Sequence, residues 1–341
     1  MYNAGIIGVG KMGISHCSIL GTHPEIQKIF VCDSSKFLLS AFKQHTDIIT
    51  YTNYRKMIDE NDLDFVLIAT PTKYHFNMVM YSLENNCNVF CEKPFSLNVN
   101  DAEKMRDLAV EKKLVNQVGF HNRFIGTFRA TKSFIDLGLI GKVYHINGES
   151  YGPVVTSEKT STWRSKPEEG GGCLFDYASH VINLMQYYVG IPQRVSGTIL
   201  KNIYSKNVED AVYSSLFYTN NITGQLSVNW SEETYRKMST KIEILGMKGK
   251  IICDAQECQV YLKDEPSLEG FIKGWNSFWI TDQTNPVWFN LRGEEYSSQI
   301  DYFIQSIKEK NIDNINSFSK SFGTDRTIEM LRKDARSNDN G

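Results

Sequence analysis

Three glycines near the start of the chain have the spacing of a phosphate-binding turn. Gly8, Gly10 and Gly13 form the pattern G-x-G-x-x-G directly after the apolar run 3–9. Gly8 permits a tight turn, Gly10 lets the backbone approach a pyrophosphate, and Gly13 lets a helix pack closely on a strand. The helix after them offers unpaired N–H groups to phosphate oxygens. On the glycines alone, a turn that binds nothing is an equal alternative.

An acidic residue at the end of the second apolar run, 28–32, completes a dinucleotide-binding pattern. Asp33 stands twenty positions after Gly13, where a carboxylate accepts hydrogen bonds from the ribose hydroxyls of an adenosine. Because its charge repels a 2′-phosphate, the sequence predicts NAD rather than NADP. The residues Ser34–Lys36 follow directly and could accommodate a phosphate, so NADP stays an open alternative.

A second candidate site contains two residue types that transfer protons. Asp176 and His180 are spaced i, i+4 and therefore share one face of a predicted helix. The three glycines at 170–172 let another backbone or a ligand come close to that helix. On spacing alone, a surface ion pair or a buried histidine satisfied by an acid explains the pair as well as catalysis does. A metal pair is disfavoured, since no third and fourth ligand is evident.

A third candidate is the tripeptide Glu92-Lys93-Pro94, which follows another apolar run. A Lys-Pro bond at such a place can be cis, although only about 5–6% of X-Pro bonds in folded proteins are. Taken alone, the tripeptide is better explained as a surface turn with a solvated lysine.

The elements that must position these residues alternate from residue 1 to about 120. The sequence predicts strands at 3–9, 28–32, 48–51, 64–69, 88–91 and 115–120, with helical patterns between them. Continuous apolar strands separated by helices indicate a doubly wound parallel sheet that is covered on both faces. Ligands bind beyond the carboxyl ends of such strands. The glycine turn, Asp33, Thr70-Pro71 and the tripeptide all follow strands, so we expect them at one edge.

The pattern changes after about residue 121. The sequence predicts a helix at 127–137, a strand at 142–151, a loop at 152–169 and a helix from the triple glycine to about 189. Six strand-like segments between 194 and 262 follow, and several alternate polar and apolar residues, as in an antiparallel sheet with one exposed face. We therefore expect a C-terminal α+β domain with a large open, mainly antiparallel sheet. Residues 264–293 fit no predicted element.

Length and composition are consistent with two domains. The chain has 341 residues, which suggests about two domains: a dinucleotide-binding domain at 1–120 and a substrate and oligomerisation domain at 121–331. A polar tail at 332–341 is predicted to fray. The formal charge of −2 provides no basic field for nucleic acid or an anionic membrane. No run approaches the ~18 apolar residues of a membrane span.

Cysteine usage and the N-terminus favour a reducing compartment. The seven cysteines are scattered and none forms C-x-x-C, so neither a zinc site nor a disulfide framework is indicated. The first apolar run belongs to the glycine motif, and we recognise no secretion signal. We therefore expect a cytoplasmic protein.

Taken together, these motifs resemble the glucose–fructose oxidoreductase / inositol dehydrogenase / rhizopine catabolism (Gfo/Idh/MocA) family. The matching segments are Gly8–Gly13, Ala69-Thr70-Pro71 with His75, Glu92-Lys93-Pro94, Gly119-Phe120 with Arg123, Trp163-Arg164, and Gly170–Gly172 with Asp176 and His180. The resemblance covers about residues 1–260. It implies a Rossmann domain followed by an α/β domain with a large open sheet. It also implies a nicotinamide-dependent oxidoreductase that acts on a sugar, cyclitol or related polyol.

The resemblance also assigns roles to single residues. Lys93 is expected near the nicotinamide and the reacting carbon, His180 as the acid/base for the hydroxyl proton, and Asp176 as a substrate ligand that helps set the state of His180. The implied cofactor-binding residues are Gly8, Gly10, Lys11, Met12, Gly13, Asp33, Ser34, Thr70, Pro71, His75, Glu92 and Lys93. The implied substrate-binding residues are Lys93, Arg123, Trp163, Arg164, Asp176 and His180.

The chemistry accounts for this division of roles. The nicotinamide takes the hydride while a base removes the hydroxyl proton. A histidine suits the proton step, because its unperturbed pKa of ~6.5 lies near working pH. A neighbouring lysine stabilises the developing alkoxide. The family's substrates vary widely, so the resemblance selects neither the substrate nor the direction of reaction.

Two alternatives to a simple sugar or polyol dehydrogenase stay open. The first is a family member that retains NAD and uses oxidation and re-reduction for glycoside cleavage or epimerisation. The second is a dinucleotide-binding regulator without turnover. The intact Lys93, Asp176 and His180 argue against the regulator, since it needs none of them.

A homodimer or homotetramer is expected through the sheet of the second domain, which the family often uses in this way. Aromatic residues suited to such a contact are Tyr204, Tyr213, Phe217 and Trp230. The alternative is that these residues pack beneath the domain's own helices.

Overall fold

A computed structural model describes residues 1–158 and 162–338 and divides into two compact units. Unit 1 comprises residues 1–121 and 286–322, and unit 2 comprises residues 122–285 and the chain from Gly323 onward. The chain therefore returns to unit 1 after it has formed most of unit 2. Residues 286–322, which the sequence analysis assigned to the second domain, lie in unit 1.

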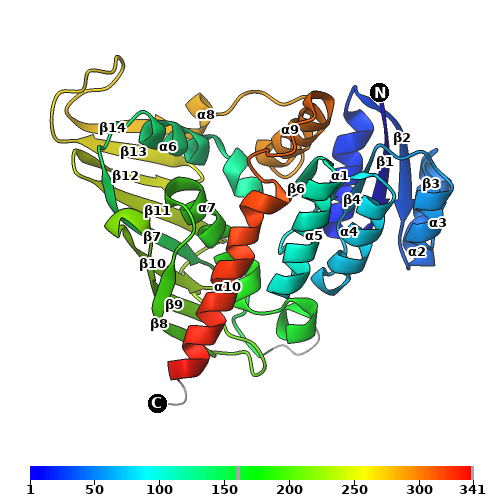
Figure 1. Ribbon diagram of the computed structural model, residues 1–341, viewed down its shortest axis with the longest axis horizontal. Coiled ribbons are helices and arrows are strands. Elements are labelled where there is room, and N and C mark those ends of the chain that lie inside the picture. The colour runs from blue at the N-terminus through cyan, green and yellow to red at the C-terminus, as the bar shows by residue number, and fades with distance from the viewer. Residues whose placement is uncertain (159–161, 339–341) are drawn as a thin grey trace. The chain divides into compact units, whose positions relative to one another are not determined.

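Unit 1 is built on a six-stranded parallel sheet with the order β3-β2-β1-β4-β5-β6, shown in blue and cyan in Figure 1. The strands are β1 (Tyr2–Ile7), β2 (Ile26–Cys32), β3 (Ile49–Tyr51), β4 (Phe65–Ile68), β5 (Asn88–Cys91) and β6 (Asn116–Val118). The helices between them are α1 (Lys11–Thr22), α2 (Lys36–His45), α3 (Tyr54–Asp59), α4 (His75–Glu84) and α5 (Val99–Glu111). The predicted doubly wound Rossmann sheet is confirmed.

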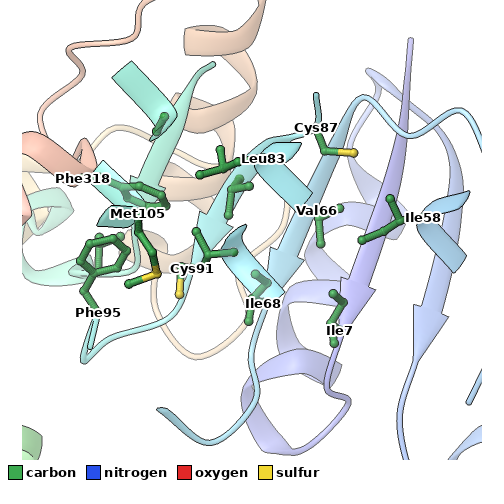
Figure 2. Packing of buried hydrophobic residues seen from close by; sticks show 14 of the residues in the cluster. Ile7, Ile58, Val66, Ile68, Leu83, Cys87, Cys91, Phe95, Met105 and Phe318 are labelled. Atoms are coloured by element: carbon green, nitrogen blue, oxygen red, sulfur yellow. The ribbon is translucent and has the colours of Figure 1, made fainter. Parts of the chain in front are cut away.

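The two faces of this sheet bury separate sets of apolar side chains, because neighbouring strand residues point to opposite faces. Ile7 belongs to the cluster that includes residues of α3, α4 and α5, and Figure 2 shows its packing. Ile6 belongs to the other cluster, with residues of α1, α2 and α9 (Glu294–Glu309). Both faces are therefore covered, as continuous apolar strands require.

Helix α9 explains why residues 286–322 belong to unit 1. The ring of Phe303 lies 5.5 Å from that of Phe65 and 5.7 Å from that of Phe90, both edge-on. Each of the three rings is fully buried. On the other face, Phe318 packs on Phe95 with ring centroids 4.4 Å apart. These contacts join segments more than two hundred positions apart in the sequence. No local sequence pattern could therefore predict that residues 286–322 belong to unit 1.

Unit 2 is built on an eight-stranded sheet with the order β14-β13-β12-β11-β7-β10-β9-β8. The strands are β7 (Val143–Tyr151), β8 (Arg194–Lys201), β9 (Ala211–Phe217), β10 (Thr223–Asn229), β11 (Ser239–Gly246), β12 (Gly249–Asp254), β13 (Glu257–Leu262) and β14 (Gly274–Trp279). Strands β7 and β10 run parallel, and the other paired strands of the described chain are antiparallel. The predicted mainly antiparallel sheet is confirmed. Helices α6 (Gly126–Asp136) and α7 (Ser179–Val189) pack on one face (Figure 1).

Strand β14 and the short helix α8 (Ile280–Gln283) occupy the segment that no pattern could assign. The last helix, α10 (Phe318–Asn338), includes residues 332–338, which were expected to fray. Leu331 and Ala335 are buried, and the Asp334 carboxylate accepts a hydrogen bond of 2.7 Å from the backbone N–H of Thr198. These contacts hold the end of the helix. Residues 339–341 lie outside the described part of the chain.

The remaining elements are single turns. Short 3-10 segments lie at Thr72–Tyr74, His121–Phe124, Trp163–Ser165, Pro167–Glu169 and Thr219–Asn221, and a π-helical turn at Leu174–Ala178 precedes α7. Within the described residues, the helices are either too short or too polar to cross a bilayer.

The expected contact surface on the sheet needs one correction. Trp230 is fully buried, and its indole N–H donates a hydrogen bond of 2.6 Å to the Asp210 carboxylate. It packs inside unit 2 and cannot form a surface contact. Tyr213 and Phe217 alternate along β9 with the buried Val212 and Leu216, so they lie on the opposite face.

The homodimer or homotetramer stays a prediction. We expect light scattering at micromolar concentration to give a mass of two or four chains, because the half-exposed aromatic side chains of β9 supply contact area. A clean monomer at that concentration would reject the expectation.

Candidate active site

The glycine turn combines two glycines that the fold needs with one that leaves room for a ligand. Gly8 has a φ of +90°, and a Cβ on it would contact the carbonyl oxygen of Ala69 at 2.8 Å. A Cβ on Gly13 would overlap the carbonyl oxygen of Gly8, so helix and strand meet there without a side chain. A Cβ on Gly10, in contrast, meets nothing within 4 Å. That open space, at the start of α1, fits a pyrophosphate.

Asp33 is tied to the glycine turn by its own carboxylate. One oxygen accepts a hydrogen bond of 2.8 Å from the backbone N–H of Val9, and the other accepts one of 2.7 Å from Ser35. The hydroxyl of Ser35 also caps α2 by accepting from the N–H of Leu38. The half-exposed carboxylate is thus oriented at the carboxyl end of β2, where a ribose of NAD is recognised. Lys11 and Ser34 are exposed beside it, and Met12 is half-buried.

We expect the wild-type protein to bind NAD at least about tenfold more tightly than NADP, because Asp33 accepts from the ribose hydroxyls and repels a 2′-phosphate. Asp33→Ala should weaken NAD binding about tenfold or more and narrow the gap to NADP. Calorimetric titration of both cofactors measures this. Asp47→Ala, which removes an exposed carboxylate of the same unit, is the matched control and should change neither affinity. Wild-type protein that binds NADP at least about tenfold more tightly than NAD would contradict our interpretation of Asp33.

Thr70 and Pro71 lie just past β4, where the nicotinamide half of the cofactor was expected. His75, grouped with them by the sequence analysis, is buried instead. Its Nε2 lies 3.0 Å from the carbonyl oxygen of Thr70 and its Nδ1 3.3 Å from that of Phe95. Burial lowers the pKa of His75, so the ring is neutral and donates one of these bonds. His75 thus joins the loops after β4 and β5, and its predicted place in the cofactor groove stays a prediction.

Glu92 is buried at the end of β5 in a set of contacts that includes a residue the sequence analysis missed. Its Oε1 lies 2.7 Å from Nε2 of His16, a fully buried residue of α1. Its Oε2 accepts a hydrogen bond of 3.2 Å from the backbone N–H of Lys93. Gly119 faces this carboxylate, and a Cβ there would lie 3.0 Å from it. The Lys93–Pro94 bond is cis. The sequence offered one signal for His16, because a titratable side chain in a largely apolar helix indicates a specific partner.

In unit 2, Asp176 and His180 lie on one continuous helical segment with an irregular first part. Asp176 belongs to the π-helical turn, and His180 follows in the first turn of α7. Both side chains are buried. The Nε of Arg164 donates a hydrogen bond of 2.9 Å to the Asp176 carboxylate. π-Helical turns occur often at functional sites, and this one departs from the regular helix that the i, i+4 spacing predicted.

The start of this segment is held by Glu209, which the sequence analysis did not identify. Gly172 has a φ of +105°, and a Cβ on it would overlap the Glu209 carboxylate. That carboxylate accepts a hydrogen bond of 2.9 Å from the backbone N–H of Leu174. The predicted need for a close approach at the triple glycine therefore has a specific cause. At Gly172 the approaching group is the Glu209 side chain, which caps the first turn, and at Gly171 it is the backbone of Arg164, whose carbonyl oxygen a Cβ would overlap.

The three other predicted substrate residues have different environments. Arg123 is 2% exposed, donates a hydrogen bond of 2.9 Å to the carbonyl oxygen of Asn183 and lies over the ring of Tyr187. Burial lowers its pKa to about 10. Arg123 therefore supports α7, and its predicted contact with substrate stays a prediction. Trp163 is 37% exposed, and the guanidinium of Arg164 lies 4.7 Å from the centre of its ring.

Arg164 also lines a cavity of about 150 Å³ within unit 2. The other lining residues are Val154, Val155, Thr162, Ser165 and Ser205. The lining therefore consists of one arginine, three residues that carry hydroxyl groups and two valines. Among the described residues, no group of three or more histidine, cysteine, aspartate or glutamate side chains is placed to hold a metal ion.

Comparison with known families identifies the class of protein. Residues 2–120 match the model described as "Oxidoreductase family, NAD-binding Rossmann fold", and residues 128–252 match the Gfo/Idh/MocA C-terminal domain. The chain belongs to the Gfo/Idh/MocA family of oxidoreductases. The resemblance inferred from the motifs is confirmed, and so are an NAD-dependent oxidoreductase and NAD as cofactor.

Several named relatives span most of this chain. A levoglucosan dehydrogenase from Pseudarthrobacter phenanthrenivorans is 25% identical over 79% of this chain and 78% of its own length. A myo-inositol 2-dehydrogenase from Thermotoga maritima is 24% identical over 78% and 79%. A 2,7-anhydro-N-acetylneuraminate hydratase from Mediterraneibacter gnavus is 25% identical over 78% and 71%. The solved structure of levoglucosan dehydrogenase with NADH and levoglucosan shares the fold, with a TM-score of 0.87, 20% identity and coverage of 98% and 97%.

Proposed function

We propose that this protein transfers a hydride between NAD and a hydroxyl-bearing carbon of a sugar, a cyclitol or a sugar derivative. The observation that carries the proposal is the buried pair Asp176 and His180, held by Arg164 and Glu209 in a chain of an NAD-binding family. Relatives named for levoglucosan and myo-inositol support this substrate class.

In this proposal the bound NAD supplies the hydride acceptor. His180 takes the proton of the reacting hydroxyl, and in the reverse direction it returns the proton to the carbonyl oxygen. Asp176 accepts hydrogen bonds from substrate hydroxyls, while its ion pair with Arg164 keeps the carboxylate oriented. Lys93 places a positive charge where the alkoxide develops. Glu209 keeps the segment that carries Asp176 and His180 in position.

A second candidate is a reaction without net oxidation, in which NAD stays bound and is reduced and re-oxidised in each cycle. One relative supports this second candidate, because it is named as a hydratase and not as a dehydrogenase. The two candidates differ in what leaves the protein. A dehydrogenase releases NADH in proportion to product, whereas the second candidate forms product from a catalytic amount of NAD.

A ligand screen followed by kinetics tests the proposal. Thermal shifts with NAD present, over sugars, anhydrosugars, cyclitols and nucleotide sugars, should single out at least one stabilising compound. That compound should then be oxidised with formation of NADH. Tight NAD binding without turnover of any compound in the panel would contradict the proposal and favour the regulator.

A further inference from the structure

A buried carboxylate lies where the first unit would hold the nicotinamide end of the cofactor. Glu92 directly follows the strand β5 and is 8% exposed. It lies within hydrogen-bonding distance of His16 at 2.7 Å and accepts from the backbone N–H of Lys93 at 3.2 Å. The absence of a side chain at Gly119 leaves room for the carboxylate. A buried charge with two donors and a dedicated space is a built feature and not a chance surface acid.

The contacts of Glu92 favour its ionised form. Among the described residues, no atom is placed to hydrogen-bond Nδ1 of His16, which is buried. Because Nδ1 has no partner among these residues, the contact with Glu92 is a hydrogen bond that the Nε2–H group of His16 donates. Burial alone would raise the pKa of Glu92, but the hydrogen bond from His16 lowers it below its usual value. Glu92 is therefore ionised.

The other histidines of unit 1 close to Glu92 do not cancel this charge. Burial lowers the pKa of His121 to about 4 and lowers that of His75, so both rings are neutral at neutral pH. His121 stacks on Tyr296, with ring centroids 4.6 Å apart. The cation nearest in sequence is Lys93, whose charge favours the ionised form of Glu92. Glu92 and Lys93 therefore place opposite charges at the end of β5.

The order of the strands indicates which end of NAD lies there. Asp33 directly follows β2 and the glycine turn follows β1, so the adenosine and the pyrophosphate take that side of the sheet. In the order β3-β2-β1-β4-β5-β6, the rest of a dinucleotide must extend beyond the carboxyl ends of β4 and β5. The nicotinamide ring carries a positive charge in NAD⁺ and none in NADH, so nearby charges act differently on the two forms.

We propose that the Glu92 carboxylate, held by His16, makes this protein favour NAD⁺ over NADH and so biases the bound cofactor towards the oxidised form. Two unit charges about 10 Å apart in a protein interior interact strongly enough to change an affinity roughly tenfold. The proposal deepens the account of the cofactor site, and it rests on NAD binding and not on the class of substrate.

The test compares the affinities of the two cofactor forms in the full chain. Glu92→Gln preserves the size of the side chain and removes its charge, so it should weaken NAD⁺ about tenfold relative to NADH. Lys93→Met removes the neighbouring positive charge, so it should strengthen the binding of NAD⁺ relative to that of NADH. Calorimetry measures the affinity for NAD⁺, and the fluorescence of NADH measures the affinity for NADH. Neither measurement requires a substrate, so failure here is distinct from failure of the proposed function.

Two matched controls separate charge from packing. His16→Gln keeps a donor towards Glu92 and keeps the negative charge, so the ratio should stay within about twofold of wild type. Asp33→Asn removes a charge at the adenosine end, so it should weaken both forms equally. Equal weakening of NAD⁺ and NADH in Glu92→Gln would overturn the proposal, because it would mean that the residue is merely structural. The same ratio change in His16→Gln as in Glu92→Gln would overturn it as well.

If Glu92→Gln does not fold, the wild-type protein decides the matter. The proposal requires NAD⁺ to bind at least as tightly as NADH. Wild-type protein that binds NADH more tightly than NAD⁺ would overturn it. Wild-type protein that binds NAD⁺ at least as tightly supports it, provided that Lys93→Met raises the relative affinity for NAD⁺ further.

Discussion

We expect the His180→Gln enzyme to turn over its substrate about 10²–10⁴-fold more slowly than wild type, the usual contribution of a positioned acid/base. Glutamine has similar volume and polarity but cannot accept and release the hydroxyl proton. NAD affinity should be unchanged, since the glycine turn and Asp33 belong to unit 1 and His180 to unit 2. Steady-state kinetics with calorimetric titration of NAD measures both quantities.

A neighbour of His180 is the structural control. The Ser179 hydroxyl is buried and donates a hydrogen bond of 2.7 Å to the carbonyl oxygen of Phe175. Ser179→Ala therefore perturbs the same turn without touching the chemistry, and it should lower Tm slightly while leaving kcat nearly intact. Asp176→Asn should raise KM and lower kcat, because Asp176 also holds the substrate. A His180→Gln enzyme with lowered Tm and near-wild-type kcat at every pH would show that the pair is structural.

Substitution of Gly13 has the largest expected effect on stability. A Cβ at this position would overlap the carbonyl oxygen of Gly8, and backbone atoms of β1 and α1 would have to move apart. Gly13→Ala should lower the free energy of unfolding by about 3 kcal/mol, at the upper end for overpacking, and should abolish NAD binding. Chemical denaturation of the ligand-free protein gives the first result and calorimetry the second.

Gly10→Ala is the matched variant, and we expect it to weaken NAD binding while it leaves the stability of the ligand-free protein nearly unchanged. A Cβ at Gly10 meets no atom within 4 Å, and its φ of −67° suits alanine. Stability without ligand should change by less than about 1 kcal/mol. NAD affinity should fall about tenfold or more, because the methyl group occupies the space of the pyrophosphate. Undiminished NAD binding by Gly10→Ala, or full stability of Gly13→Ala, would contradict the roles assigned to these glycines.

The first sheet was predictable because its signals are local. Ile6 and Ile7 point to opposite faces and are both buried, so a continuous apolar run identified a strand covered on both sides. The spacing of Gly8, Gly13 and Asp33 specified the turn and the acid without reference to distant residues. These features depend on neighbours along the chain, where sequence patterns are informative.

The parts that were not predicted depend on long-range contacts. His16 meets Glu92 across 76 positions, and Glu209 meets the first turn before α7 across 35. The packing of Phe303 on the first sheet likewise has no local signature. The motif predicted Arg123 as a substrate ligand, and no signal in the sequence indicated its contacts with the carbonyl of Asn183 and the ring of Tyr187.

Isotope transfer tests the central claim most directly. A compound from the ligand screen, deuterated at the carbon that bears the reacting hydroxyl, is incubated with the wild-type protein and NAD⁺, and the nicotinamide is examined by mass spectrometry. The account predicts NADH that carries one deuterium per molecule of ketone formed, because the hydride moves directly from carbon to cofactor. Unlabelled NADH, or a product that retains its deuterium on that carbon, would contradict it.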